Sequence, residues 1–145
     1  MSDKYDALKL ENQLCFPLYV ASKEVVRRYK PLLDELNLTY TQYITLLVLW
    51  EQKKLSVKEL GEFLFLDSGT LTPVLKSLEK KGYISRKKSK DDERVLIVEL
   101  TDGGKELREK AVSVPSGIAE CIDIDKKDAE KLLKILHNML SGFKE

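Results

Sequence analysis

The stretch SVKELGEFLFLDSGTLTPVLKSLEKKGYISRK, residues 56–87, decides the fold of this chain. Ser56 and Glu59 have the spacing of a capping box, in which each side chain accepts a hydrogen bond from the other residue's backbone N–H, and they predict a helix over about 57–64. After a turn at 66–69, apolar residues recur at helical spacing, namely Leu71, Val74, Leu75 and Leu78. The stretch therefore predicts two short helices joined by a tight turn.

The second of these helices has a clear end and a difficult beginning. Gly82 follows its last apolar residue and is typical of a helix stop. Pro73 has no N–H and lies beyond the expected first turn. We therefore expect either a regular helix that starts near Thr70 or a distortion of its first turns.

A β-hairpin is predicted directly after this helix. The segments 83–86 and 95–100 are apolar or β-branched, and the polar stretch KKSKDDE between them indicates an exposed tip. Helix, turn, helix and hairpin in this order are the pattern of a winged helix-turn-helix, a module that binds double-stranded DNA.

The charges agree with this interpretation. From Lys76 to Arg94 the net charge is +4, whereas the rest of the chain sums to −3 within a total of +1. Such a local positive field suits a phosphate backbone, although lysine-rich tips are also common on surfaces that bind nothing. The candidate DNA-contacting residues are Ser68, Thr70, Thr72, Lys76, Ser77, Arg86, Lys87, Lys88, Lys90, Asp92 and Arg94. Arg94 is long enough to enter a minor groove, and Asp92 is spaced to hold its guanidinium in a bidentate pair.

The chain upstream of this module also has helical periodicity. From Leu10, apolar residues recur at threes and fours and predict a long first helix, with a kink near Pro17. A break is expected at Pro31, followed by a short helix over 31–37. The next helix, capped by a threonine and running through Trp50, contains YITLLVLW and is expected to be fully buried.

Two further helices are predicted after the hairpin. Thr101 opens the first, which Pro115 interrupts, and the residues from Asp125 to Phe143 form the last. No internal repeat or flexible linker divides the chain. We therefore expect one integrated fold that is mainly α with a small β-wing (α+β).

Composition excludes several classes of protein. The 145 residues are 43% hydrophobic and 34% charged, which is typical of a single soluble globular domain. The longest apolar run, Tyr43 to Trp50, is far below the about 20 residues that span a bilayer. The opening MSDKYDALKLENQ lacks the apolar stretch of a secretory signal, so we expect a cytoplasmic protein that does not enter membranes.

Metal and cofactor sites are not predicted. Cys15 and Cys121 lie 106 positions apart without a CxxC motif, which excludes a disulfide scaffold and a zinc ribbon. His137, the single histidine, has no second ligand at metal spacing, and the pair Gly103 and Gly104 matches no phosphate-binding loop. We expect neither a metal ion nor a cofactor.

Two segments carry a resemblance to a known family. LDSGTLTPVLKSLEKKGYISRK (66–87) and DERVLIVELT (92–101) closely resemble the recognition helix and wing of the MarR family of dimeric bacterial regulators. The resemblance implies a homodimer whose two recognition helices and wings read a pseudopalindromic double-stranded DNA operator, with Arg94 and Asp92 at the family's wing positions. It divides a single domain, 1–145, into dimerisation helices at 1–36 and 102–145 and a winged helix-turn-helix DNA-binding region at 39–101.

The resemblance extends to one subgroup of that family. LENQLCF (10–16), YKPLLDELNLTYTQY (29–43) and LDSGTLTP (66–73) look like the organic hydroperoxide resistance regulators, repressors that sense peroxides through a cysteine. The similarity covers nearly the whole chain and is weakest beyond Pro115.

Cys15 is not marked as reactive by its own neighbourhood. On position alone it is most simply a plain buried cysteine, and Glu11, one helical turn earlier, opposes a thiolate. The resemblance implies instead that Cys15 is the peroxide sensor and is hydrogen-bonded to tyrosines that match Tyr29 and Tyr40, with Tyr19 as a third donor. If Cys15 and Tyr29 share one helix they are about 21 Å apart, so the contact should come from the other subunit.

Cys121 determines the fate of an oxidised Cys15. A sulfenic acid at Cys15 either persists until a small thiol caps it or meets a second protein cysteine. Some members of the subgroup join the two subunits by a disulfide in this region, which implies a bond from Cys15 to Cys121 of the partner subunit; the alternative is that Cys121 is an inert, partly buried thiol. We expect a repressor that binds DNA when reduced and leaves it when oxidised.

Three alternative functions remain open. A thiol peroxidase is disfavoured because the chain lacks alternating strands and has Asn12, rather than threonine, three residues before Cys15. A MarR-like repressor that responds to a small-molecule effector would leave the DNA-binding prediction intact and make Cys15 incidental. A winged helix that binds protein is disfavoured by its basic wing.

Overall fold

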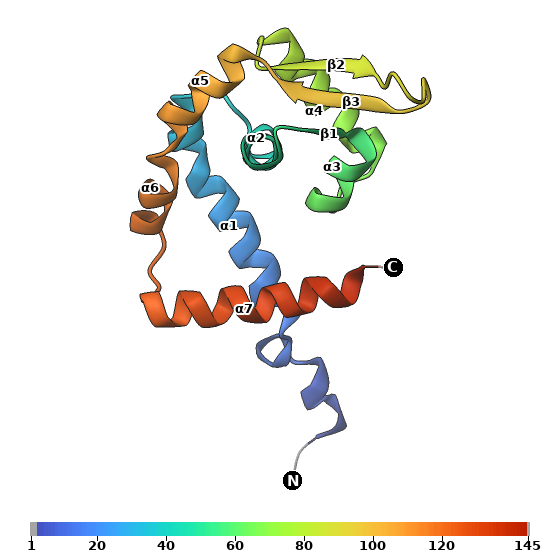
Figure 1. Cartoon of the computed structure of the whole chain (residues 1–145). Coiled ribbons are helices and arrows are strands. Elements are labelled where there is room, and N and C mark those ends of the chain that lie inside the picture. Colours follow the sequence, from blue (N-terminus) through green and yellow to red (C-terminus); the bar gives the residue numbers. More distant parts are fainter. Residues whose placement is uncertain (1–2, 145) are drawn as a thin grey trace.

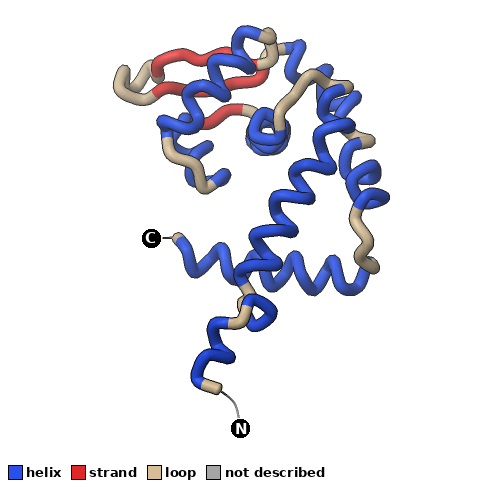
Figure 2. Tube along the Cα trace, turned by 180° about the vertical axis from the view of Figure 1, so that it is seen from behind, coloured by secondary structure: helices blue, strands red, loops and turns tan. Residues whose placement is uncertain are grey.

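The computed structural model describes residues 3–144 as a mainly helical protein with a small sheet at one end (Figures 1 and 2). Two short 3-10 helices, η1 (Lys4–Leu8) and η2 (Leu10–Asn12), come first. The chain then forms α1 (Cys15–Asp34), α2 (Tyr40–Gln52), β1 (Lys54–Ser56), α3 (Val57–Leu64), α4 (Ser68–Lys80), β2 (Ile84–Lys88), β3 (Leu96–Leu100), α5 (Asp102–Ala111), α6 (Val114–Cys121) and α7 (Lys126–Phe143). The predicted fold class is confirmed.

The helix-turn-helix forms as its caps predict. Ser56 Oγ accepts from the Glu59 N–H at 3.0 Å, and a Glu59 carboxylate oxygen accepts from the Ser56 N–H at the same distance. The second helix, α4, starts at Ser68 rather than near Thr70, because Asp67 caps it by accepting from the Thr70 N–H at 2.7 Å. Pro73 lies inside α4, which continues past it to Lys80.

The predicted hairpin belongs to a slightly larger sheet. Strands β2 and β3 pair antiparallel, with Arg86 opposite Val98, and β1 pairs antiparallel on the other side of β3, with Leu55 opposite Val98. The strand order within the described residues is β1-β3-β2. The sequence did not indicate β1, which is three residues long and lies between two helices.

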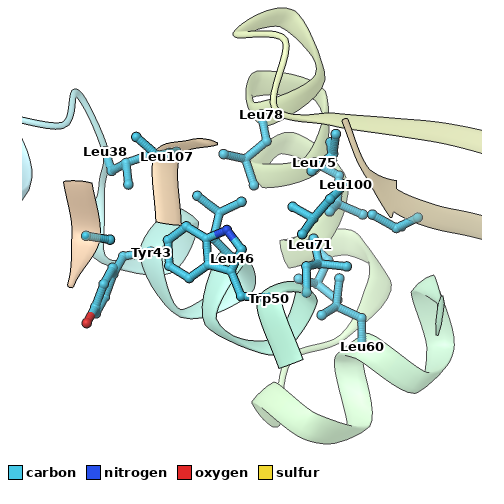
Figure 3. Packing of buried hydrophobic residues seen from close by; sticks show 14 of the residues in the cluster. Leu38, Tyr43, Leu46, Trp50, Leu60, Leu71, Leu75, Leu78, Leu100 and Leu107 are labelled. Carbon is cyan, nitrogen blue, oxygen red and sulfur yellow. The ribbon is translucent and has the colours of Figure 1, made fainter. Parts of the chain in front are cut away.

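The hydrophobic core surrounds α2 (Figure 3). Trp50 donates a hydrogen bond from Nε1 to the Gly104 carbonyl at 2.9 Å, which satisfies the indole and ties α2 to α5. The expectation that YITLLVLW is fully buried is wrong at three positions, because 42% of Leu47 is exposed and Ile44 and Val48 are only partly buried. Labelled core side chains that meet α2 come from α3, α4, β3 and α5, namely Leu60, Leu71, Leu75, Leu78, Leu100 and Leu107.

The first long helix differs from its prediction at both prolines. It begins at Cys15 rather than at Leu10, and the segment before it forms 3-10 turns. Pro17 therefore lies in the first turn of α1, where a missing N–H is tolerated. The expected break at Pro31 is wrong, since α1 continues through it to Asp34.

The C-terminal helices agree with the prediction more closely. Thr101 caps α5 by accepting from the Gly104 N–H at 3.1 Å, and Pro115 occupies the first turn of the separate helix α6, where the interruption was expected. Asp125 caps the last helix, α7, which has no buried residue within the described chain. Among residues 3–144, no helix combines the length and apolarity needed to cross a lipid bilayer.

Candidate DNA interface and redox site

The outer face of α4 carries most of the polar residues predicted for it. Leu71 and its apolar stripe point into the core, which leaves Ser68, Thr70 and Lys76 exposed. Thr72 is half-buried and donates its hydroxyl to the Ser68 carbonyl at 2.7 Å. Ser77, also predicted to face DNA, instead accepts a hydrogen bond from Gln42 of α2 at 2.8 Å.

The wing tip holds the predicted bidentate pair. Arg94 Nε lies 3.1 Å from Asp92 Oδ1, and Arg94 Nη2 lies 3.2 Å from Oδ2. These side-chain hydrogen bonds, with a further one from the Arg94 N–H, lower the pKa of Asp92. Both residues lie in the turn of the tip rather than on a strand, and 91% of the Arg94 side chain is exposed. The guanidinium is therefore held in one orientation and is open to a partner.

The basic residues of the wing stem are of two kinds, exposed lysines and an arginine that pairs with α4. Lys87, Lys88 and Lys90 are exposed, as a phosphate-binding surface requires. Arg86, predicted to join them, is only 18% exposed and lies 3.1 Å from Glu79 of α4. The main-chain N–H of Arg86 also donates to Glu79, and its side-chain hydrogen bond is the main cause that lowers the pKa of that carboxyl group.

Cys15 is the first residue of α1 and is exposed, so the interpretation as a plain buried cysteine is wrong for this chain. Glu11 lies in η2, so it is not one turn earlier on the same helix as expected. Leu14 precedes α1 without a side-chain cap, which leaves backbone N–H groups of the first turn open to a negatively charged partner.

Tyr29 and Tyr40 meet within one subunit, together with Tyr43, to form a tyrosine cluster. The Tyr29 ring lies edge-on to that of Tyr40 at 5.0 Å between centroids and 5.7 Å from that of Tyr43. Burial, followed by the two neighbouring phenols, raises the pKa of Tyr29 to about 12, and burial also raises the pKa of Tyr40 and Tyr43. The cluster thus keeps its O–H groups protonated and able to donate at neutral pH.

Sequence reasoning missed Tyr43, although its spacing of three residues from Tyr40 on a predicted helix places both on one face. Tyr19, the third predicted donor, lies one turn after Cys15 on α1 and is 58% exposed. Lys23 Nζ lies 4.8 Å from the centre of the Tyr19 ring. Tyr19 therefore lies apart from the cluster, at the cysteine end of the helix.

Cys15 begins α1, whereas Cys121 ends α6 and lies beside the second half of α1. Helix α6 packs along α1 so closely that a Cβ on Gly117 would lie 2.9 Å from the Leu32 side chain. Cys121 ends α6, and its carbonyl accepts from Arg28 Nη1 at 3.5 Å. Thirteen residues of helix separate Arg28 from Cys15, a rise of about 20 Å. A disulfide within one subunit is excluded in this conformation, because its two Cα atoms must lie within about 7 Å.

Comparison with known proteins agrees with this architecture. A family model described as "Transcriptional regulator SarA/Rot" matches residues 27–111. An organic hydroperoxide resistance transcriptional regulator of Bacillus subtilis is 51% identical over 97% of this chain and 95% of its own length. The chain belongs to the MarR family of transcriptional regulators. The resemblance to the organic hydroperoxide resistance subgroup is thereby confirmed, and so is the expectation of a regulator rather than an enzyme.

Solved structures of MarR-family regulators match nearly the whole chain. The structure of reduced AbfR bound to DNA has a TM-score of 0.78 at 35% identity and covers 97% of this chain and 98% of that one. Disulfide-formed AbfR has a TM-score of 0.63 at 34% identity and covers 96% and 92% of the two chains. AbfR is a protein of Staphylococcus epidermidis. The present conformation is therefore more similar to the reduced, DNA-bound form of that relative than to its disulfide form.

Proposed function

We propose that this regulator is a homodimeric repressor that binds a pseudopalindromic operator when Cys15 is reduced and leaves it when a peroxide oxidises that residue. The observation that carries the proposal is the position of Cys121. Its carbonyl is bound by Arg28, which precedes Tyr29 of the tyrosine cluster and is separated from Cys15 of the same subunit by about 20 Å of helix. A partner subunit that places its Cys15 against these tyrosines would bring it close to Cys121 as well.

Dimer formation is supported by the unpartnered apolar surface at both ends of the chain. No residue of α7 is buried in the described subunit, although the helix is strongly amphipathic in sequence. Large exposed patches of this kind mark interaction surfaces. The exposed apolar residues are Leu8, Leu10, Leu14, Phe16 and Leu18 near the N-terminus and Ile124, Leu132, Leu133, Ile135, Leu140 and Phe143 near the C-terminus.

DNA binding is supported by the pairing of a polar helix face with a basic wing. In a dimer, the exposed residues of α4 enter successive major grooves about one helical turn apart. Arg94, oriented by Asp92, reaches the adjacent minor groove, and Lys87, Lys88 and Lys90 contact phosphates. In this proposal Arg86 contributes to DNA binding indirectly, because its pair with Glu79 holds the wing against α4.

The sensing reaction is a two-step oxidation of thiols. The Cys15 thiolate attacks the terminal oxygen of an organic hydroperoxide, a sulfur–oxygen bond forms and the O–O bond breaks, so that Cys15 becomes a sulfenic acid. The departing alkoxide takes a proton from solvent and leaves as an alcohol. The Cys121 thiol of the partner subunit then attacks that sulfur, forming the disulfide and releasing water. Donated hydrogen bonds from Tyr29 and Tyr40 of the partner, with Tyr19 at the cysteine end, orient the sulfur for the first step.

The disulfide abolishes operator binding by changing the distance between the two recognition helices. Its sulfurs must approach to about 2 Å, which draws the start of α1 of one subunit onto α6 of the other. The recognition helices are rigidly joined to these helices through α2 and α5, so their separation no longer matches the half-site spacing. The relative AbfR has been solved bound to DNA in its reduced and its overoxidised form, and also in a disulfide form, which supports a switch here that acts through the disulfide.

Operator titration tests the proposal. Fragments selected from the protein's own genome are titrated with reduced and hydroperoxide-treated protein, as wild type and as Cys15→Ser. We expect treatment to abolish binding by the wild type and to leave Cys15→Ser bound. Equal loss of operator binding in both proteins would contradict the sensor role of Cys15. Operator binding that peroxide leaves unchanged in both proteins would favour a small-molecule effector.

A further inference from the structure

Gln42 is a polar side chain in the core, and all of its polar groups are used. Only 5% of the residue is exposed. Its Nε2 donates to Ser77 Oγ on the recognition helix at 2.8 Å, and its Oε1 accepts from the Thr39 N–H at 3.0 Å. A leucine would fill this position without requiring partners, so the hydrogen bonds are the distinguishing property of the residue.

A second connection runs beside the first. Lys81, which directly follows α4, donates from Nζ to Gln42 Oε1 at 3.0 Å and also to the carbonyl of Asn37. Asn37 forms the turn between α1 and α2 and has a positive φ of 56°. Gln42 and Lys81 thus bind the second half of the recognition helix to the corner where α1 meets α2.

The same corner carries the tyrosine cluster. Tyr40 and Tyr43 flank Gln42 in the first turn of α2, which is closed by the Tyr43 N–H donating to the Thr39 carbonyl at 2.9 Å. The two tyrosines meet Tyr29 of α1, whereas Gln42 reaches α4. One hydrogen-bonded turn therefore holds the tyrosines on one side and the recognition helix on the other.

We propose that Gln42 is a positioning residue for DNA recognition, which makes the placement of α4 follow any displacement of the tyrosine cluster. The inference rests on the proposed function, in which oxidation of the partner's cysteine disturbs this cluster. Apolar contacts between α2 and α4 allow small sliding and rotation, whereas two directed hydrogen bonds of Gln42, one to Ser77 in α4 and one from Lys81 directly after it, fix the orientation of the helix. Gln42 thereby couples the redox state to operator affinity.

The test compares two affinities for each variant. Operator dissociation constants are measured for reduced and hydroperoxide-treated dimers of wild type, Gln42→Met and Gln52→Met. Met has nearly the volume of Gln without its donor and acceptor, and Gln52 is an exposed residue at the end of the same helix. We expect the ratio of oxidised to reduced dissociation constants to fall at least about fivefold in Gln42→Met and to be unchanged in Gln52→Met.

A purely structural role gives a different result. If Gln42 only stabilises the fold, both dissociation constants of Gln42→Met rise by the same factor, the ratio is unchanged, and the inference is overturned. Ser77→Ala removes the acceptor on α4 while leaving the other hydrogen bonds of Gln42 in place, and it is expected to lower the ratio in the same direction. This variant decides the matter if Gln42→Met does not fold, since an unchanged ratio in Ser77→Ala overturns the inference.

The proposed function fails in a distinguishable way. A wild-type ratio of one would overturn the redox function and the inference with it. A large wild-type ratio that persists in both variants would overturn the inference alone and leave the cysteine switch standing.

Discussion

Arg86 of the wing is bound to Glu79 of the recognition helix, with its main-chain nitrogen and its Nη2 each 3.1 Å from a carboxylate oxygen. The Arg86 Nε is buried without a hydrogen-bond partner among residues 3–144. Leaving a buried donor unpaired has a free-energy cost, which opposes the contacts that Arg86 makes with Glu79. The pair fixes the angle between α4 and the hairpin that carries Arg94.

Glu79→Gln is expected to weaken operator recognition through the wing. The substitution removes the charge from a charge-assisted pair and should lower the ratio of operator to nonspecific affinity about fivefold. In an Arg94→Ala background the same change should have little further effect, because the wing no longer inserts a side chain. A rise in the affinity ratio on Glu79→Gln would contradict this and indicate that Glu79 withholds Arg86 from direct contact with DNA.

Arg94→Ala tests the wing tip itself. Loss of an oriented guanidinium from each wing should weaken operator binding by the dimer by about tenfold or more and make the salt dependence of log K less steep by about 0.9 per subunit. Lys110→Ala, which removes an exposed charge from α5, is the matched control. Titrations over a range of salt concentrations measure both quantities. The same slope in Arg94→Ala and wild type would show that Arg94 does not approach the DNA backbone.

The tyrosine cluster predicts a loss of stability at high pH. Tyr29 has a pKa of about 12 in the folded protein against the usual 10.0, so between these values the unfolded chain releases a proton that the folded chain retains. The stabilisation is fully present below pH 10.0 and is lost as pH rises toward about 12. Denaturant unfolding of wild type and Tyr29→Phe on both sides of pH 10.0 measures the effect. A pH slope that is unchanged in Tyr29→Phe would rule out Tyr29 as its source.

Alanine substitutions at two glycines test the effect of close packing and the effect of helix propensity separately. A Cβ on Gly61 would lie 2.6 Å from the backbone oxygen of Leu66 in the helix-turn-helix corner, whereas a Cβ on Gly142 of α7 meets no atom within 4 Å. We expect Gly61→Ala to destabilise the protein by about 1–3 kcal/mol, since the backbone must shift. Gly142→Ala should stabilise it by at most about 1 kcal/mol. Thermal or chemical unfolding that ranks the two variants in the opposite order would contradict the described corner.

Much of the fold could be predicted because local signals and tertiary packing agree. The capping box at Ser56, the stop at Gly82 and the apolar spacing of α4 each specify an element within a few residues. The prolines were harder to interpret. Pro31 removes one backbone hydrogen bond from α1, and the packing of the helix against α6 is sufficient to keep it continuous.

The unpredicted features depend on contacts between distant segments. Strand β1 has three residues, and its pairing partner in β3 lies more than forty positions away. Arg86 and Arg94 look alike in the sequence, but only Arg86 faces a carboxylate on α4. The interaction of Ser77 with Gln42 likewise required the packing of α4 on α2 to be known.

The measurement that tests the central claim most directly uses mixed dimers. Cys15→Ser and Cys121→Ser subunits are combined so that a dimer can form a single disulfide, from the one remaining Cys15 to the one remaining Cys121. The mixed dimer is first separated from both homodimers. After hydroperoxide treatment we expect the isolated mixed dimer to run as a covalent dimer on non-reducing gels and to lose operator binding, with neither result in the Cys15→Ser homodimer and no Cys15–Cys121 bond in the Cys121→Ser homodimer. Operator release by the mixed dimer without a covalent bond, or a covalent mixed dimer that still binds the operator, would contradict the account.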